Sequence, residues 1–163
     1  MASVTTYERL LAFLDQHNVS YRLIDHPPEG RTELVSIMRG HDLRHAAKCM
    51  VLIIKQGKKV TRYVLAVVPG NARVDLKAVK SLMQATYVSF ASPEIAEELS
   101  GAPTGAVLPF SFHPSLELMV EPALLESDDI YFNAARLDRS MALSSREYIA
   151  VAKPRLVAIG LTA

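Results

Sequence analysis

The chain has 163 residues, of which 50% are hydrophobic and 21% are charged, and its formal net charge is +1. That composition excludes a disordered protein, and the weak net charge argues against a protein that coats long nucleic acids. The single cysteine, Cys49, excludes an intramolecular disulfide. The length fits one domain, which we expect to cover residues 1–163.

The first third of the chain predicts a helix, a strand and a second helix. Apolar residues at helical spacing follow Thr5 and Thr6 and end near residue 17. Residues 20–26 alternate between apolar and polar, which predicts a short strand. Residues 32–40 predict a helix with Thr32 as its N-cap and Gly40 at its C-terminal end.

The middle of the chain predicts a hairpin and two more helices. Residues 48–54 and 60–68 are apolar runs separated by a Gly-containing turn, so we expect them to pair. A helix over 75–83, a strand over 86–90 and a helix over 92–99 follow. Pro93 suits the first turn of the last of these, and Gly101 suits its end.

The last third predicts a loop over 105–109, strands over 116–120, 130–132 and 141–143, and a final helix from residue 144 that Pro154 ends. Helices and strands are therefore interleaved, and at least one hairpin is present. This pattern is typical of one α/β domain with a mixed sheet.

Several motifs are missing. The sequence contains no Gly-x-Gly-x-x-Gly, P-loop, Gly-x-Ser-x-Gly or His-Glu-x-x-His, so no cofactor is predicted. His41 and His45 have the i, i+4 spacing of metal ligands, but a solvated pair explains them better, and no metal site is expected. The N-terminus lacks the pattern of a signal peptide and no apolar stretch is long enough to cross a bilayer, so we expect a cytoplasmic protein without a membrane partner.

Lys48 is the strongest single candidate for a functional residue. It stands where a polar segment becomes an apolar strand, so its stem can lie along the core while its ammonium points into a cleft. An ammonium in that place suits a phosphate or a ribose hydroxyl. The alternative is a lysine that ends the sheet and points to solvent. Cys49 could be a nucleophile, although a small buried hydrophobic residue explains it better.

A family resemblance rests on residues in a fixed order. A strand ends in His26, Thr32-Glu33 opens a helix, and Lys48 begins a strand; Val67-Val68-Pro69-Gly70, Val74-Asp75-Leu76-Lys77 and Gly105-Ala106-Val107-Leu108-Pro109 follow. Over residues 5–160 the chain resembles the YbaK/ProX family of trans-acting aminoacyl-tRNA deacylases, which are related to the insertion domain of prolyl-tRNA synthetase. The resemblance implies a largely antiparallel, barrel-like sheet surrounded by helices. It also implies hydrolysis, in trans, of the ester between tRNA and a mischarged small amino acid such as serine, alanine or cysteine.

The resemblance also implies roles for individual residues. Lys48 matches the family lysine that anchors the terminal nucleotide or the reacting ester, and we take it as the catalytic residue. His26 matches a histidine found after the first strand. The pocket for the aminoacyl group is implied to be bounded by the loop of Gly105, Ala106, Val107, Leu108 and Pro109. No cofactor is implied; the partners are the tRNA acceptor end and, as a further candidate, an aminoacyl-tRNA synthetase.

Two points depart from the family pattern. The loop continues as Phe110-Ser111-Phe112-His113 in place of small residues, and we hypothesise that Ser111 and His113 line the amino-acid pocket. Strand alternation would instead point both of them to solvent. Some family members have an acidic residue near the position of Ser140, and that carboxylate is not carried over.

Other functions stay open at this point. The chain could be a module that binds aminoacyl-tRNA 3′ ends or a synthetase without hydrolysis, or a hydrolase of another small acyl ester or nucleotide. Nine basic residues are candidates for a tRNA-binding face: Arg22, Arg31, Arg39, Arg44, Lys55, Lys58, Lys59, Arg73 and Lys80.

Overall fold

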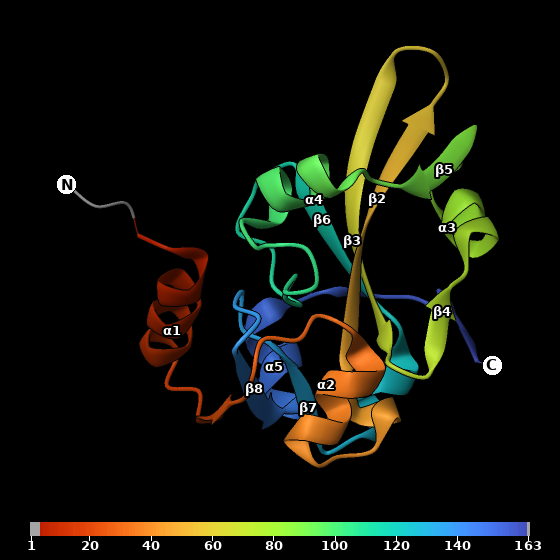
Figure 1. Cartoon of the computed structure of the whole chain (residues 1–163). Coiled ribbons are helices and arrows are strands. Elements are labelled where there is room, and N and C mark those ends of the chain that lie inside the picture. Colours follow the sequence, from red (N-terminus) through yellow and green to blue (C-terminus); the bar gives the residue numbers. More distant parts are fainter. Residues whose placement is uncertain (1–3, 163) are drawn as a thin grey trace.

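Helices and short sheets alternate along the chain in the computed structural model, which describes residues 4–162 (Figure 1). The α-helices are α1 (Thr6–Gln16), α2 (Thr32–Arg39), α3 (Leu76–Leu82), α4 (Pro93–Ser100) and α5 (Ser145–Ala152), and two 3₁₀ turns are η1 (Leu43–His45) and η2 (Pro122–Glu126). The strands are β1 (Tyr21–Asp25), β2 (Ala47–Gln56), β3 (Val60–Pro69), β4 (Ala72–Val74), β5 (Tyr87–Phe90), β6 (Leu116–Val120), β7 (Asp129–Asn133), β8 (Arg139–Ser144), β9 (Arg155–Leu156) and β10 (Gly160–Thr162).

The strands form three sheets. The largest has the order β5-β2-β3-β6-β9, a second has the order β1-β8-β7, and β10 pairs with β4. The pairings are antiparallel except for β3 with β6 and β6 with β9, so the expected mixed, largely antiparallel α/β fold is confirmed. Within residues 4–162 these sheets do not close into one barrel, and the barrel-like part of the expectation is not confirmed.

The β2–β3 hairpin is the longest element, and its tip extends beyond the rest of the molecule in Figure 1. Its register runs from Ala47 opposite Pro69 to Gln56 opposite Val60, as the two apolar runs predicted. On its other side, β2 pairs with β5 only over residues 52–55. The edge of β2 before residue 52 therefore has no neighbouring strand of that sheet, and this open edge positions the site described below.

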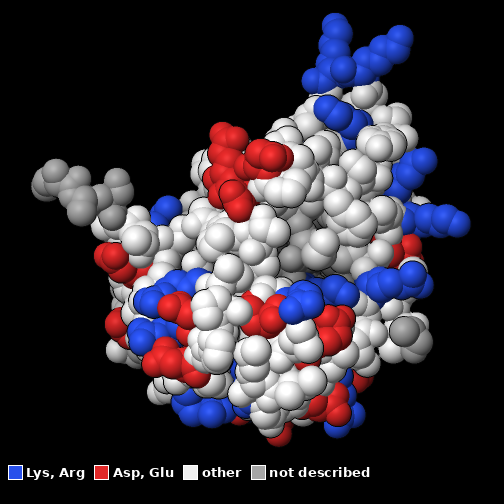
Figure 2. Space-filling view, in the orientation of Figure 1, with Lys and Arg blue, Asp and Glu red and all other residues white. Residues whose placement is uncertain are grey.

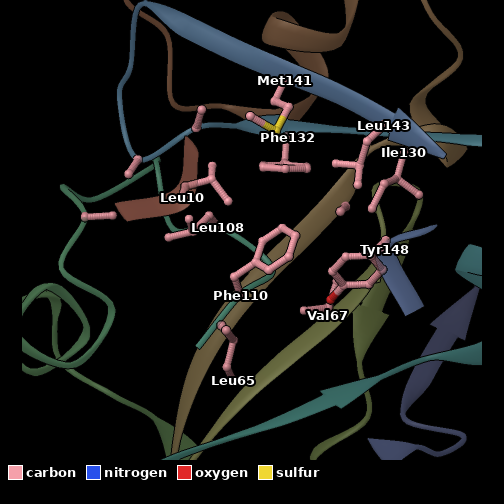
Figure 3. Close-up of a cluster of buried hydrophobic side chains, with 14 of the residues drawn as sticks. Leu10, Leu65, Val67, Leu108, Phe110, Ile130, Phe132, Met141, Leu143 and Tyr148 are labelled. Atoms are coloured by element: carbon pink, nitrogen blue, oxygen red, sulfur yellow. The ribbon is translucent and has the colours of Figure 1, made fainter. Parts of the chain in front are cut away.

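The apolar side chains form two buried clusters. The larger contains residues from α1, α5, β7, β8 and the loop before β6, including Leu10, Phe110, Phe132, Met141 and Tyr148 (Figure 3). The smaller lies between the main sheet and α3 and β4. Because the two clusters cover opposite faces of β2, alternate residues of that strand belong to different clusters.

Most of the predicted helix ends are confirmed by their caps. The Thr5 hydroxyl accepts from the N–H of Glu8 at 3.1 Å, and Gly40 and Gly101 end their helices in the left-handed conformation. Thr32 was wrong as an N-cap: Arg31 takes that position without a side-chain cap bond, and Thr32 is the first helical residue.

The short strands β4, β9 and β10 were not predicted, because strands of two or three residues carry little pattern of their own.

No helix among residues 4–162 combines the length and hydropathy that a membrane crossing requires.

Tyr148 connects α5 to the loop after Gly105, and its removal gives a first test. Its fully buried hydroxyl donates to the carbonyl oxygen of Pro109 at 2.6 Å. We expect Tyr148→Phe to lower the free energy of unfolding by about 1–3 kcal/mol, because the buried carbonyl loses its donor. Urea unfolding measures this change. Tyr87→Phe is the control, since Tyr87 is exposed, and equal effects of the two substitutions would contradict the assignment.

Candidate functional site

A cavity of about 300 Å³ lies at the open edge of β2. Residues 46–51 form one wall, α4 and the loop around Gly105 form another, and α2 with Asn133 closes the remaining side. Figure 2 shows this region as uncharged surface between the acidic side chains over α4 and the mixed charges of the lower half of the molecule. Most of the residues that line the cavity are apolar, and polar side chains occur at a few places on its wall.

The backbone of β2 contributes free polar groups to this wall. Pro69 has no N–H, so its pair with Ala47 is not a hydrogen-bonded pair of the β2–β3 ladder. By the alternation of an antiparallel ladder, the N–H and C=O of Cys49 also point away from β3. They point along the edge that β5 leaves open, where a substrate can form hydrogen bonds with them.

Lys48 lies in the cavity wall, at the start of the buried part of β2. Its ammonium donates to the carbonyl oxygen of Ala72, in β4, at 3.0 Å. An ammonium carries three hydrogens, so two stay available for another acceptor. The alternative expectation, a lysine that points only to bulk solvent, does not describe this half-buried side chain.

The wall opposite Lys48 depends on two glycines in contact. Gly105 has φ +88°, and a Cβ built on it would lie 2.7 Å from the Cα of Gly30. A side chain at Gly105 would thus meet backbone rather than a flexible group. Only glycine at residue 105 allows both the left-handed conformation and this approach.

The Asn133 side chain connects the segment that contains Gly30 to the segment that contains Gly105. Its Nδ2 donates to the carbonyl oxygens of Glu29 at 2.9 Å and Gly105 at 3.0 Å. Its Oδ1 accepts from Arg39 Nη2 at 3.0 Å and from the Ser140 hydroxyl at 2.9 Å. Two carbonyl partners require two N–H donors, so the orientation of the amide is fixed by its neighbours.

Arg39 is a half-buried cation that has no carboxylate partner among residues 4–162. It donates from Nε to the Ser140 hydroxyl at 2.7 Å and lines the cavity beside Asn133, and no ion pair of Arg39 occurs among residues 4–162. Burial lowers the pKa of Arg39 to about 10, so the guanidinium stays charged at neutral pH. Its Nη1 lies 3.5 Å from His41 Nε2, and the other N–H groups of the guanidinium can donate to an acceptor in the cavity.

Cys49 lines the same cavity but is unsuited to act as a nucleophile. Burial raises the pKa of its thiol well above the usual range, although the charge of Arg39 opposes that shift. A protonated thiol attacks esters poorly, because the thiolate is the reactive form. The interpretation of Cys49 as a small buried hydrophobic residue fits this environment.

The structure brings together three of the residues expected at the site: Lys48, Gly105 and Val107. The other loop residues, Ala106, Leu108 and Pro109, are buried behind the loop and do not line the cavity. They support the loop from within the core. His26 is also outside the cavity, and its Nε2 lies 2.6 Å from the Ser140 hydroxyl, which links it to Asn133.

Ser111 and His113 lie elsewhere. They line a separate cavity with Phe13 and Phe112. The Ser111 hydroxyl donates to the carbonyl oxygen of Leu116 at 2.6 Å, and His113 Nδ1 accepts from the N–H of Ser115 at 3.0 Å. The structure therefore does not place them at the cavity beside Lys48, because both side chains stabilise the turn that leads into β6.

Sequence reasoning missed Asn133 and Gly30 and misplaced Arg39. Arg39 was one of nine candidates for a tRNA-binding face, but it follows buried Val35 by four residues and so shares the inner face of α2. That spacing was the signal that could have found it. Asn133 carried no signal, because its partners lie far away along the chain.

The rim of the cavity carries negative charge on the side of α4. Glu97 Oε1 accepts from both the N–H and the hydroxyl of Thr104, each at 3.0 Å, and so fixes the start of the Gly105 loop. Figure 2 shows this acidic surface above the cavity, whereas Lys and Arg side chains gather at the hairpin tip and along the edge that carries α3 and β4. The two sides of the cavity mouth therefore have opposite charge.

Comparison with known proteins identifies relatives of the whole chain. Residues 26–151 match the model of the aminoacyl-tRNA editing domain. The chain is 40% identical over 159 residues to the multifunctional Ser/Thr-tRNA deacylase ProXp-y of Escherichia coli strains K12 and O157:H7, covering 97% of this chain and 95% of each relative.

Solved structures share the fold at lower identity. The hypothetical protein APE2540 is similar with a TM-score of 0.85 and 20% identity, covering 94% of this chain and 100% of its own. A candidate trans-editing enzyme for prolyl tRNA synthetase is similar with a TM-score of 0.78 and 19% identity, covering 98% of this chain and 99% of its own.

The contact between the two glycines predicts a large effect of Gly105→Ala. Gly57 provides a matched control, because it has φ +72° and open space where a Cβ would lie. We expect Gly57→Ala to cost roughly 1–2 kcal/mol of unfolding free energy through backbone strain alone. Gly105→Ala should cost more, because it adds the clash with Gly30. Thermal or urea unfolding compares the two variants, and equal losses would show that the contact is unimportant.

Proposed function

Because the chain belongs to the aminoacyl-tRNA editing family and is a deacylase that hydrolyses the ester of mischarged tRNA, we propose that the cavity at the open edge of β2 binds this ester. We further propose serine and threonine as the amino acids removed, as the name of the Escherichia coli relatives suggests. The observation that carries the proposal is one cavity lined by Lys48, Arg39 and the Gly105 loop.

The loop supports hydrolysis through its backbone. Neither the N–H of Gly105 nor that of Val107 donates a hydrogen bond within the described chain, and both residues line the cavity. When water adds to the ester carbonyl, the oxygen becomes negative and needs such donors. The bond from the carbonyl carbon to the ribose oxygen then breaks, and the ribose oxygen takes up a proton.

Lys48 is proposed to bind the negative charge of the substrate. Its contact with Ala72 holds the ammonium at the cavity wall, where its other hydrogens can reach the ester or the neighbouring phosphate. Positioning by such contacts can supply much of the barrier reduction for an activated ester. The proton of the attacking water would pass, by way of the neighbouring free hydroxyl of the substrate ribose, to the ribose oxygen that leaves.

Arg39 is proposed to select the side chain. Small apolar residues, among them Val35, Ala47 and Ala96, restrict the size of the cavity, while the Arg39 guanidinium offers donors on its inner side. A hydroxyl of serine or threonine can accept from it. A side chain of equal size without a hydroxyl would leave the guanidinium without this acceptor.

Two further parts of the sequence-based expectation stay predictions. The first is that residues 1–163 form one deacylase domain and work on tRNA in the cytoplasm. The second is an aminoacyl-tRNA synthetase as a second partner, in line with the solved editing enzyme for prolyl tRNA synthetase. Co-purification with the synthetases that charge tRNA with proline, serine and threonine would test it.

Lys48→Ala tests the proposed reaction. We expect kcat/KM for Ser-tRNA and Thr-tRNA to fall by about 100-fold to 1,000-fold, because a positioned charge at the ester is lost. Release of labelled amino acid measures the rate. Lys55→Ala is the matched control, since Lys55 is exposed on the same strand and donates to Thr61. Normal turnover by Lys48→Ala would refute the assignment, and binding of these tRNAs without hydrolysis by the wild type would favour a binding module.

The side-chain proposal predicts discrimination between isosteric amino acids. Thr-tRNA should be hydrolysed at least about 100-fold faster than the same tRNA carrying valine, which matches threonine in size but lacks the hydroxyl. Arg39→Lys should narrow this ratio, because lysine keeps the charge but loses the planar array of donors. Equal rates for threonine and valine in the wild type would remove the role of Arg39.

A further inference from the structure

We propose that a second cleft, between β2, β4, β5 and β10, binds the terminal adenosine of the tRNA, with its base against Phe90 and its 5′-phosphate near Arg73. This inference rests on the proposed function and adds a nucleotide site to it. The cleft has a volume of about 360 Å³.

The position of the cleft matches the covalent structure of the substrate. It shares Lys48, Met50 and Phe90 with the first cavity, so the two volumes are separated only by these side chains. An aminoacyl group is esterified directly to the ribose of the last nucleotide. Its base and phosphate must therefore lie within one nucleotide of the ester, and this cleft is the neighbouring space.

The walls of the cleft suit a nucleobase. Phe90 and Leu161 are 48% and 45% exposed, and Val74 and Leu76 extend the same apolar surface. Aromatic and apolar side chains of this kind stack against bases, and each base contributes roughly 1–3 kcal/mol. An adenine in the cleft would cover the apolar area that the protein leaves exposed.

The charged side chains around the two cavities favour entry of the tRNA end past β4. Arg73 lines the cleft and forms no ion pair with residues 4–162, so its guanidinium is available to a phosphate. Glu97 and the other carboxylates of α4 lie across the first cavity and would repel the tRNA backbone. A tRNA end that enters past β4 meets Arg73 and then Lys48, and it avoids α4.

The test uses two Ser-tRNA substrates, one ending in adenosine and one with cytidine as its last nucleotide. We expect the wild type to prefer adenosine by about tenfold in kcat/KM, the ratio that corresponds to a difference of about 1.4 kcal/mol between stacking of the larger adenine and of cytosine. Phe90→Ala should abolish this preference. Because Phe90 also lines the first cavity, Leu161→Ser tests the second cleft alone and should reduce the preference as well. Tyr87→Ala is the control, since Tyr87 is an exposed aromatic residue of β5 outside both cavities.

The outcomes separate this inference from the proposed function. Hydrolysis at equal rates for both ends, or an unchanged preference in Phe90→Ala and Leu161→Ser, would overturn the adenosine site and leave the deacylase intact. If the wild type hydrolyses neither substrate, the proposed function fails. Titration with adenosine 5′-monophosphate then tests separately whether the cleft binds a nucleotide. Nuclear magnetic resonance shifts confined to residues around Phe90, and lost in Leu161→Ser, would support the site; their absence would overturn it.

Discussion

The contact between the backbones of Gly30 and Gly105 is the constraint on which the site depends. It brings the segment before α2 against the loop after α4, two parts of the chain separated by the whole β2–β3 hairpin. The Asn133 amide fixes this contact because its two N–H groups bind one carbonyl from each segment. Ser140 and Arg39 in turn fix the amide oxygen. Under the proposed function, these hydrogen bonds would hold the Gly105 loop in place before the ester binds, as catalysis by positioned donors requires.

The cavity itself results from unequal strand lengths. β2 has ten residues, but β5 pairs with only four of them, and the chain turns away into α4 instead of continuing along the edge. An exposed strand edge normally invites unwanted pairing with other chains. Here α2, α4 and the Gly105 loop surround the edge and leave room for a small molecule. The same open edge that would be a liability on a flat sheet therefore becomes a binding wall with free backbone groups.

Local patterns explain what the sequence could predict. The hairpin, the helices that begin near Thr5, Asp75 and Ser92, and the position of Lys48 at the start of a buried strand all depend on neighbouring residues. Asn133 and Arg39 could not be assigned in this way, since they meet only through the packing of β7 against α2. Ser111 and His113 were assigned to the pocket from their distance to the loop along the chain. The structure turns the chain there, and it uses both side chains to stabilise that turn.

The distribution of charge explains how a chain of net charge +1 can handle a polyanion. A uniformly basic surface would bind any part of a tRNA, and its affinity would not depend on the acylated end. In this protein the carboxylates of α4 stand on one side of the cavity, and Lys48 and Arg73 stand on the other. Under the proposed function, the weak total field would limit binding to the body of the tRNA, while the opposed charges would orient the last nucleotide. On this proposal, selectivity for the acylated end would come from contacts within the two cavities rather than from attraction at long range.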